Sequence, residues 1–162
     1  MHIMSNDLYD LMAQALEEAE KGFAVGEVPV GALLIGRDGT ILSRAYNQPL
    51  SLKDPTAHAE ILALREGALY YNNYRMNDTT LVSTVEPCPM CMGAALHARI
   101  SRLIFGAYDV KWGAAGSLFD LAADKRLNHR IEVVSGIMEK ECRELLQEFF
   151  RIQRNKKNGL MS

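Results

Sequence analysis

The sequence lacks long hydrophobic runs. No segment of the 162 residues approaches the roughly 20 consecutive apolar residues that a membrane-spanning helix needs. The first residues, Met1 to Asp7, also lack the basic stretch followed by an apolar run that is typical of a secretion signal. The expectation is therefore a chain that spans no membrane and stays in the cytoplasm.

Cysteine is scarce. The chain has three cysteines, an odd number, and Cys88 and Cys91 are too close in sequence for an ordinary structural bridge. Disulfides are also rare in a reducing compartment, so this pair indicates metal binding or catalysis rather than a disulfide framework. Cys142 is expected to be an inert residue of the final helix.

The sequence also has no large excess of charge of either sign. Its formal net charge is −2, so the bulk composition by itself indicates neither a nucleic-acid partner nor a disordered tail. The charge is unevenly placed, because all 20 acidic residues precede Arg151 whereas Arg151, Arg154, Lys156 and Lys157 follow. With 48% hydrophobic residues, the chain is expected to form one domain over residues 1–162, with a basic end from about residue 151.

The spacing of apolar residues predicts an alternation of helices and strands. Helices are expected over about residues 7–22, 55–68, 88–98, 118–123 and 139–154, and strands over about 28–35, 40–46, 79–85, 103–107 and 131–134. The tripeptide Arg37-Asp38-Gly39 predicts an antiparallel hairpin between the first two strands. A helix and more than a dozen residues separate the last two strands, which permits a parallel crossover. These elements predict an α/β fold in which a mixed sheet of five strands has helices on both faces.

Two short motifs supply side chains that bind metals. His58-Ala59-Glu60 is followed later in the chain by Pro87-Cys88-Pro89-Met90-Cys91. Cys88 and Cys91 stand three residues apart at the start of a predicted helix, so they share one face, and the positive helix end favours their thiolates. With His58 as a third ligand, a Zn²⁺ ion keeps a fourth position for water, whose pKa such a metal lowers to about 7.

Glu60 is expected to carry protons in such a site. It lies two residues from His58, a spacing that does not stack side chains along a helix, so both must enter the site from an irregular first turn. The alternative is a structural zinc site, which needs no proton carrier and is closed by a fourth protein ligand. The candidates for that ligand are His2, His97, His129 and Cys142, none of which lies in a second ligand motif, and His97 is expected to be a core histidine.

The pattern H-x-E…P-C-x-x-C is the known signature of the zinc-dependent nucleobase deaminases. The metal motif alone does not select the base, since deaminases of cytosine, cytidine, deoxycytidylate and guanine have a similar one. Together with further segments, however, the chain resembles the bacterial tRNA-specific adenosine deaminases over nearly its whole length. These segments are Glu27-Val28-Pro29-Val30-Gly31-Ala32, Asn47, Asp54-Pro55-Thr56-Ala57, Asp109-Val110-Lys111-Trp112-Gly113-Ala114-Ala115-Gly116-Ser117, Asn128-His129-Arg130 and Phe149-Phe150-Arg151.

The resemblance implies a three-layer αβα fold like that of cytidine deaminase, a homodimer, and one zinc ion per subunit held by His58, Cys88 and Cys91. It implies that Glu60 shuttles protons while the wobble adenosine of a tRNA anticodon stem-loop is converted to inosine. It assigns substrate binding to Asn47, Ala59, Asp109, Lys111, Phe150 and Arg151. The likeness departs at Gln153, where many relatives carry another arginine.

Plainer interpretations of the substrate-binding residues stay open at this point. Asn47 precedes Pro49, where asparagine is a common turn residue, and Asp109 and Lys111 fit a solvated loop held open by glycines. Basic residues in a last helical turn also complement the helix dipole without touching RNA. Trp112, the only tryptophan, either stacks on a nucleotide flanking the target or anchors its loop in the core.

Two other functions are alternatives to tRNA deamination. An enzyme of the same chemistry that acts on a free base or nucleoside, such as guanine or cytosine, needs no basic tail. A zinc-stabilised RNA-binding subunit without catalysis is expected to lack the carboxylate that Glu60 provides.

Overall fold

The computed structural model describes residues 5–159. Its elements in chain order are α1 (Ser5–Ala24), β1 (Gly31–Ile35), β2 (Ile41–Tyr46), α2 (Pro49–Leu52), α3 (Ala59–Tyr71), β3 (Thr80–Val85), α4 (Pro89–His97), β4 (Arg102–Ala107), β5 (Glu132–Val134) and α5 (Glu139–Gly159). The five strands form one sheet in the order β2-β1-β3-β4-β5. β1 is antiparallel to β2 and β3, whereas β3, β4 and β5 run parallel. The predicted mixed sheet, its hairpin and its parallel last pair of strands are confirmed.

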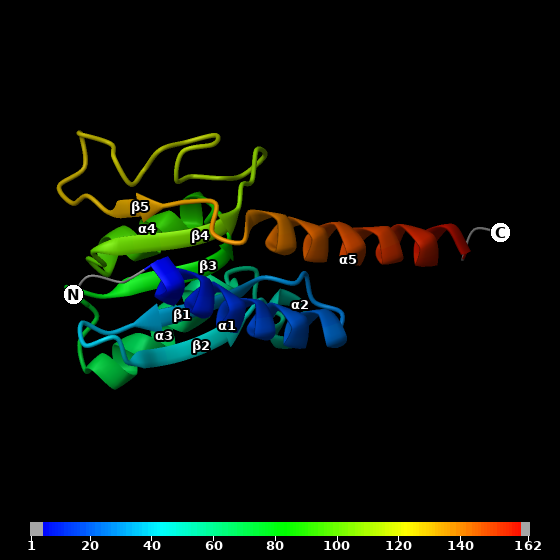
Figure 1. The fold of residues 1–162 in the computed structure, drawn as a ribbon, viewed down its shortest axis with the longest axis horizontal. Helices are drawn as coiled ribbons and strands as arrows, with labels where there is room; N and C mark the ends of the chain where they lie inside the picture. The colour runs from blue at the N-terminus through cyan, green and yellow to red at the C-terminus, as the bar shows by residue number, and fades with distance from the viewer. Residues whose placement is uncertain (1–4, 160–162) are drawn as a thin grey trace.

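Helices cover both faces of the sheet, as Figure 1 shows. Because side chains alternate along a strand, β1 sends Leu33 and Ile35 to one face, where they pack in a cluster with Met12 of α1 and Cys142 of α5. Leu34 of the same strand packs on the other face, in the cluster formed with α3 and α4. Both faces of the sheet are therefore buried, which confirms the three-layer αβα arrangement.

Close packing of α1 on the sheet depends on a glycine. A Cβ atom at Gly31, the first residue of β1, would lie 1.9 Å from the carbonyl oxygen of Ala15 in α1. The strand predicted over residues 28–35 begins later, at Gly31. The lack of a side chain at this residue lets the backbone of α1 approach the strand closely.

Two predicted boundaries on the way to the first motif need correction. The helix expected from residue 55 begins at Ala59, because the Asp54 carboxylate accepts hydrogen bonds from the Thr56 backbone N–H at 2.8 Å and its hydroxyl at 2.7 Å. This turn occupies the residues that would have formed the first helical turn. The short helix α2 was not predicted, and its N-terminus is held by Glu27, which accepts hydrogen bonds from Leu50 and Ser51.

The predicted helix over residues 118–123 is wrong. The backbone N–H groups of Leu118 and Phe119 both donate to the carbonyl of Gly113, at 2.9 and 3.0 Å, and that of Leu121 donates to Ala114. These contacts replace helical hydrogen bonds with contacts to the preceding loop, so the connection from β4 to β5 is irregular although the strands are parallel.

The final helix extends beyond the body of the molecule, and its C-terminal end lies far from the sheet in Figure 1. Its buried residues are Cys142 and Phe149, and the Phe149 ring packs edge-on against Phe23 of α1 with ring centroids 5.6 Å apart. The basic residues after Phe149 are consequently exposed. Within residues 5–159, no helix has the length and apolar character that crossing a membrane requires.

Candidate functional site

Two helices begin at the site and present a ligand side chain each from the residue that caps them. His58 precedes α3 and Cys88 precedes α4, both with extended backbone, and Pro89 occupies the first position of α4. Proline is favoured there because its missing N–H would have no helical partner in any case. The positive ends of both helices therefore point at the same place and favour an anionic sulfur or carboxylate.

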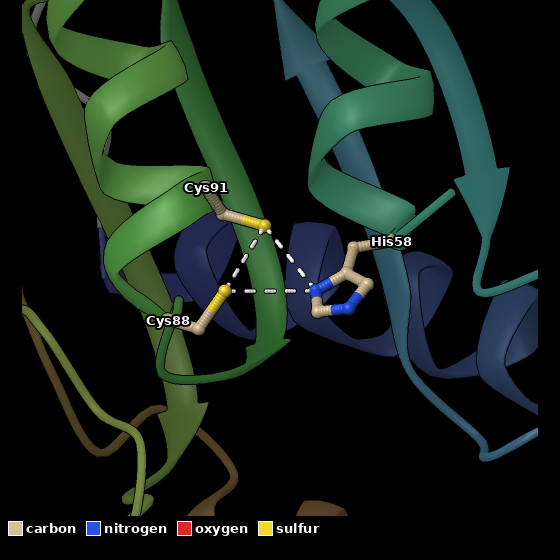
Figure 2. Close-up of side chains that lie close together, drawn as sticks. All are labelled: His58, Cys88 and Cys91. Carbon is tan, nitrogen blue, oxygen red and sulfur yellow. Dashed lines mark hydrogen bonds between the residues drawn. The ribbon is translucent and has the colours of Figure 1, made fainter. Parts of the chain in front are cut away.

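The three side chains proposed as metal ligands converge in space, as Figure 2 shows. His58 Nδ1 lies 3.6 Å from Cys88 Sγ and 3.5 Å from Cys91 Sγ, and the two sulfurs are 3.7 Å apart. Tetrahedral zinc with bonds of about 2.3 Å to sulfur and about 2.0 to 2.1 Å to nitrogen sets such pairs about 3.5 and 3.8 Å apart. The donor set and its spacing therefore fit Zn²⁺.

The sulfurs differ in environment. The hydrogen bond from Cys91, together with nearby His58, lowers the pKa of Cys88 to about 4, although partial burial acts in the opposite direction. Donation of that hydrogen bond and burial raise the pKa of Cys91. The lowered pKa favours a thiolate at Cys88 at neutral pH, and as zinc ligands both sulfurs would be thiolates.

Glu60 enters the same site without belonging to the ligand group. Its side chain is 4% exposed, and Ser83 of β3 donates a hydrogen bond of 3.2 Å to its Oε1 atom. Burial raises the pKa of this carboxyl. The group of metal-ligand atoms found within residues 5–159 consists of His58, Cys88 and Cys91, and Glu60 lines the cavity beside that group.

A cavity of about 620 Å³ opens at this point, in the usual size range for small-ligand sites. It lies at the carboxyl end of the parallel strand β3, where α/β sheets commonly bind ligands. Its lining residues are Val28, Val30, Asn47, Pro49, Pro55, His58, Glu60, Val85, Glu86, Cys88, Pro89, Met90, Asp109 and Trp112.

No fourth protein ligand completes a structural zinc site within the described part of the chain. His97 is exposed at the end of α4, so the expectation of a core histidine was wrong, and His129 lies 2.7 Å from the Ile100 carbonyl. Cys142 is buried on the opposite face of the sheet, where burial raises its pKa to about 12, as expected of an inert thiol. His2 lies outside the described residues. The ligand group is therefore open on the cavity side, as in catalytic zinc sites.

Comparisons with known proteins agree with this geometry. Residues 5–107 match the family model described as the cytidine and deoxycytidylate deaminase zinc-binding region. The tRNA-specific adenosine deaminase of Haemophilus influenzae is 49% identical over 91% of this chain and 85% of its own length. The chain belongs to the tRNA-specific adenosine deaminase family.

Solved structures give the same result. One from a study of A-to-I editing by tRNA:A34 deaminases at the wobble position of transfer RNA superposes with a TM-score of 0.80 and 38% identity, over 84% of this chain and 98% of that one. The guanine deaminase of Bacillus subtilis is less similar, with a TM-score of 0.60 and 29% identity over 90% of this chain and 92% of that one. The fold and the zinc cofactor of this deaminase are thus those that the sequence predicted.

The predicted substrate-binding residues separate into distinct places in this deaminase. Asn47 and Asp109 line the cavity with Glu60. The Asn47 side chain forms no hydrogen bond with residues 5–159, so its amide is free to meet a ligand, whereas one Asp109 oxygen is occupied by two N–H groups of its own loop. Ala59 is fully buried in the core between the sheet and α3, and its side chain is not among those that line the cavity in residues 5–159.

Of the other three predicted residues, Phe150 and Arg151 belong to α5 and Lys111 belongs to the loop beside it. Lys111 and Phe150 line a separate groove of about 610 Å³ between the loop after β4 and α5, and Gln153 lies there too. This groove is basic, since its charged lining residues are Lys111, Arg143, Arg154 and Lys157. Arg151 lies elsewhere on the helix and is paired with Glu148, with Nη2 and Oε1 2.6 Å apart.

Glu86 is a site residue that the sequence interpretation missed. It is 3% exposed, and its carboxylate accepts hydrogen bonds from the backbone N–H groups of Asp109, Ala115 and Ser117 at 3.0 to 3.2 Å, and from the Ser117 hydroxyl. Because Glu86 directly precedes the Pro87-Cys88 motif, these hydrogen bonds fix the loop that carries Asp109 and Trp112 next to that motif. A glutamate at the end of an otherwise buried strand was the available signal.

Replacing this carboxylate is expected to loosen the loop. In Glu86→Gln an amide NH₂ faces backbone N–H donors, and each buried group left without a partner costs about 1 to 3 kcal/mol. We expect a lower melting temperature and faster hydrogen exchange at Ala115 and Ser117, with zinc retained. Glu27→Gln is a matched control, since Glu27 is a buried carboxylate that accepts three hydrogen bonds from Leu50 and Ser51 instead. Equal loop exchange in both variants would refute a specific role for Glu86.

Proposed function

We propose that this deaminase converts adenosine to inosine at the wobble position of a tRNA anticodon. The observation that supports this most directly is one cavity that combines an open His58, Cys88 and Cys91 group with a buried carboxylate, Glu60, that is not a ligand. The high identity to a tRNA-specific adenosine deaminase supports the choice of substrate.

In this proposal the metal ligands and Glu60 have separate roles. His58, Cys88 and Cys91 hold the zinc ion, which when bound supplies an activated water at neutral pH. Glu60 would take one proton from the attacking water and deliver it to the ring nitrogen beside the amino-bearing carbon. It would then pass the second proton of that water, from the oxygen now bound to this carbon, to the amino group, which leaves as ammonia. Its burial keeps bulk water from competing for that proton.

Asn47 orients the target nucleoside in this proposal. Its uncommitted side-chain amide lines the cavity together with Val30, Pro49 and Val85, which offer apolar surface to the base. Apolar walls with a few placed polar groups are typical of sites that bind small aromatic ligands. The backbone of Ala59, at the first position of α3, is the part of that residue which can serve the substrate.

The groove along α5 is proposed to hold the RNA backbone. Lys111, Arg154 and Lys157 supply its positive charge, because the fourth basic side chain, Arg143, is paired with Glu139. Trp112, the neighbour of Lys111, lines the catalytic cavity, so the cavity and the groove adjoin at this loop. Phe150, 43% exposed, adds an aromatic surface in the groove. Arg151 contributes less than the resemblance implies, because its guanidinium is paired with Glu148.

Binding of an anticodon stem-loop is expected to weaken with salt. Each phosphate neutralised on single-stranded nucleic acid lowers the slope of log K against log[salt] by about 0.7, so three contacts give a slope of roughly −2. Arg154→Gln should make the slope shallower by about one contact, and Arg151→Gln should change it less. Fluorescence anisotropy over a salt series measures both. A binding constant that does not change with salt would favour a free base or nucleoside as the substrate.

One assay separates the proposed function from its alternatives. The protein is incubated with an anticodon stem-loop, the same sequence as a duplex, free adenosine, cytidine and guanine, and the products inosine, uridine and xanthine are measured. We expect inosine from the stem-loop and little from the duplex, since extracting a paired base costs a few kcal/mol. Xanthine or uridine from a free substrate would refute the proposal, and so would RNA binding without any product.

Three further expectations belong to the same proposal: one deaminase domain over residues 1–162, expected from composition, a homodimer, implied by the resemblance, and a cytoplasmic location. The substrate itself supports the last of these, because bacterial tRNA is a cytoplasmic molecule. Analytical ultracentrifugation of the zinc-loaded protein tests the dimer.

A further inference from the structure

Trp112 presents an uncovered aromatic surface at the catalytic cavity. Its side chain is 64% exposed and lines the same cavity as His58 and Glu60. Tryptophan is usually well buried, so an indole left in solvent beside a reacting centre offers a flat face to a ligand. Of the two alternatives for Trp112, anchoring of its loop in the core is therefore excluded.

The loop that carries this indole is held in one conformation. Asp109 Oδ1 accepts hydrogen bonds from the backbone N–H groups of Lys111 at 3.0 Å and Trp112 at 3.1 Å. The next residue, Gly113, donates to the Asp109 carbonyl at 2.8 Å, and a Cβ there would lie 2.4 Å from the Glu86 carboxylate. Because the loop is fixed before any ligand arrives, a contact to Trp112 pays little ordering entropy.

The other aromatic of the loop is already engaged. The Tyr108 hydroxyl donates a hydrogen bond of 3.0 Å to Ser135, and its ring packs edge-on against Phe105 with centroids 5.3 Å apart. The Trp112 indole, by contrast, makes neither a ring stack nor a hydrogen bond with any residue from 5 to 159. Of the two, Trp112 lines the catalytic cavity and has no such contact, whereas Tyr108 faces the α5 groove.

Building on the proposed function, we propose that Trp112 forms a second base subsite, on which the base of a nucleotide next to the target adenosine stacks. A base that enters the cavity leaves its neighbours in the strand unstacked, so their π-faces are free to stack on an aromatic side chain. Lys111 lies beside Trp112 and faces the basic groove, so this loop offers an aromatic face and a cation in succession. That succession matches the alternation of base and phosphate along a single strand.

The test is a double-mutant cycle between the protein and the RNA. Zinc-loaded wild type and Trp112→Ala are titrated with a stem-loop in which purine riboside replaces the target adenosine, so that no amino group can leave. Two further RNAs are abasic at the nucleotide before or after the target. We expect Trp112→Ala to weaken binding of the intact stem-loop about 5- to 150-fold, and one abasic RNA to lose this sensitivity. Trp112→Phe should retain most of the affinity.

Fluorescence gives an independent readout, because Trp112 is the only tryptophan in the chain. Its emission should be open to acrylamide quenching in the free protein and change on RNA binding. Tyr70→Ala is the matched control, since Tyr70 is 74% exposed at the end of α3 and is outside the cavity lining. Neither variant should lower the melting temperature much.

Several results would overturn the subsite. Equal loss of affinity for all three RNAs would place Trp112 elsewhere on the ligand, and protection from acrylamide in the free protein would mean that a second copy of the chain already covers it. Normal RNA binding by Trp112→Ala would refute the subsite and leave the proposed function intact. If the intact stem-loop does not bind to the wild type and yields no inosine from adenosine, the proposed function fails, and the subsite with it.

Discussion

Glu60→Ala is expected to keep its zinc and its fold while losing about 10² to 10⁴ in the rate of inosine formation, the usual range for a general acid-base group. The reason is the position of Glu60: it is buried in the cavity but is not one of the three ligand residues. Single-turnover kinetics on an anticodon stem-loop, with zinc measured per chain, provide the test.

Glu60→Gln controls for the space that alanine leaves. Glutamine has the same size and can still meet the Ser83 hydroxyl, but it cannot carry a proton, so its loss of rate should match that of Glu60→Ala. A glutamine variant with nearly full activity would show that Glu60 acts only through packing. Stoichiometric loss of zinc from either variant would instead make Glu60 a ligand and contradict the proposed mechanism.

Cys91→Ala and Cys88→Ala are expected to lose bound zinc and, with it, inosine formation down to background. Stability should also fall, because binding of a metal to the native state is coupled to folding. A ligand held at 100 times its dissociation constant contributes about 2.7 kcal/mol. For a chain of this size, that corresponds to a melting temperature lower by about 5 to 10 °C. Elemental analysis and thermal melting measure the two effects.

Cys142→Ala is the matched control for these variants. Cys142 is a buried cysteine in the cluster between the sheet, α1 and α5, on the face away from His58. Its replacement should leave the zinc content unchanged and cost only the packing of one sulfur. If chelation left the melting temperature and activity of the wild type unaltered, the metal would be neither catalytic nor stabilising in this protein.

The order of the elements was readable from the sequence because it depends on local pattern. Apolar spacing placed all five strands within a few residues, and the long connection between the last two strands permitted the parallel pairing that the structure has. The errors occurred where short-range hydrogen bonds of turns and loops replaced the hydrogen bonds of a helix. The helix expected over residues 118–123 was lost to contacts with Gly113 and Ala114, and the first turn of α3 was lost to Asp54.

Three predicted RNA-contact residues show the limit of the resemblance. It named Asp109, Lys111 and Arg151 together, but the structure directs the first to the cavity, the second to the α5 groove and the third to an ion pair with Glu148. Which way an exposed side chain faces depends on the path of its backbone. In this loop, that path is set by the buried carboxylate of Glu86.

The sequence by itself determined the chemistry of the site. A histidine and two cysteines bind zinc because of their own atoms, and the three-residue spacing of Cys88 and Cys91 at a helix start is a local property of the chain. Only the tertiary structure decided that His58 meets them at 3.5 to 3.6 Å, that no further histidine or cysteine within residues 5–159 closes the group, and that Trp112 stands exposed beside it. Those facts depend on how two helices pack on one sheet and how a loop is tied to Glu86, and such long-range contacts leave no periodic trace in a sequence.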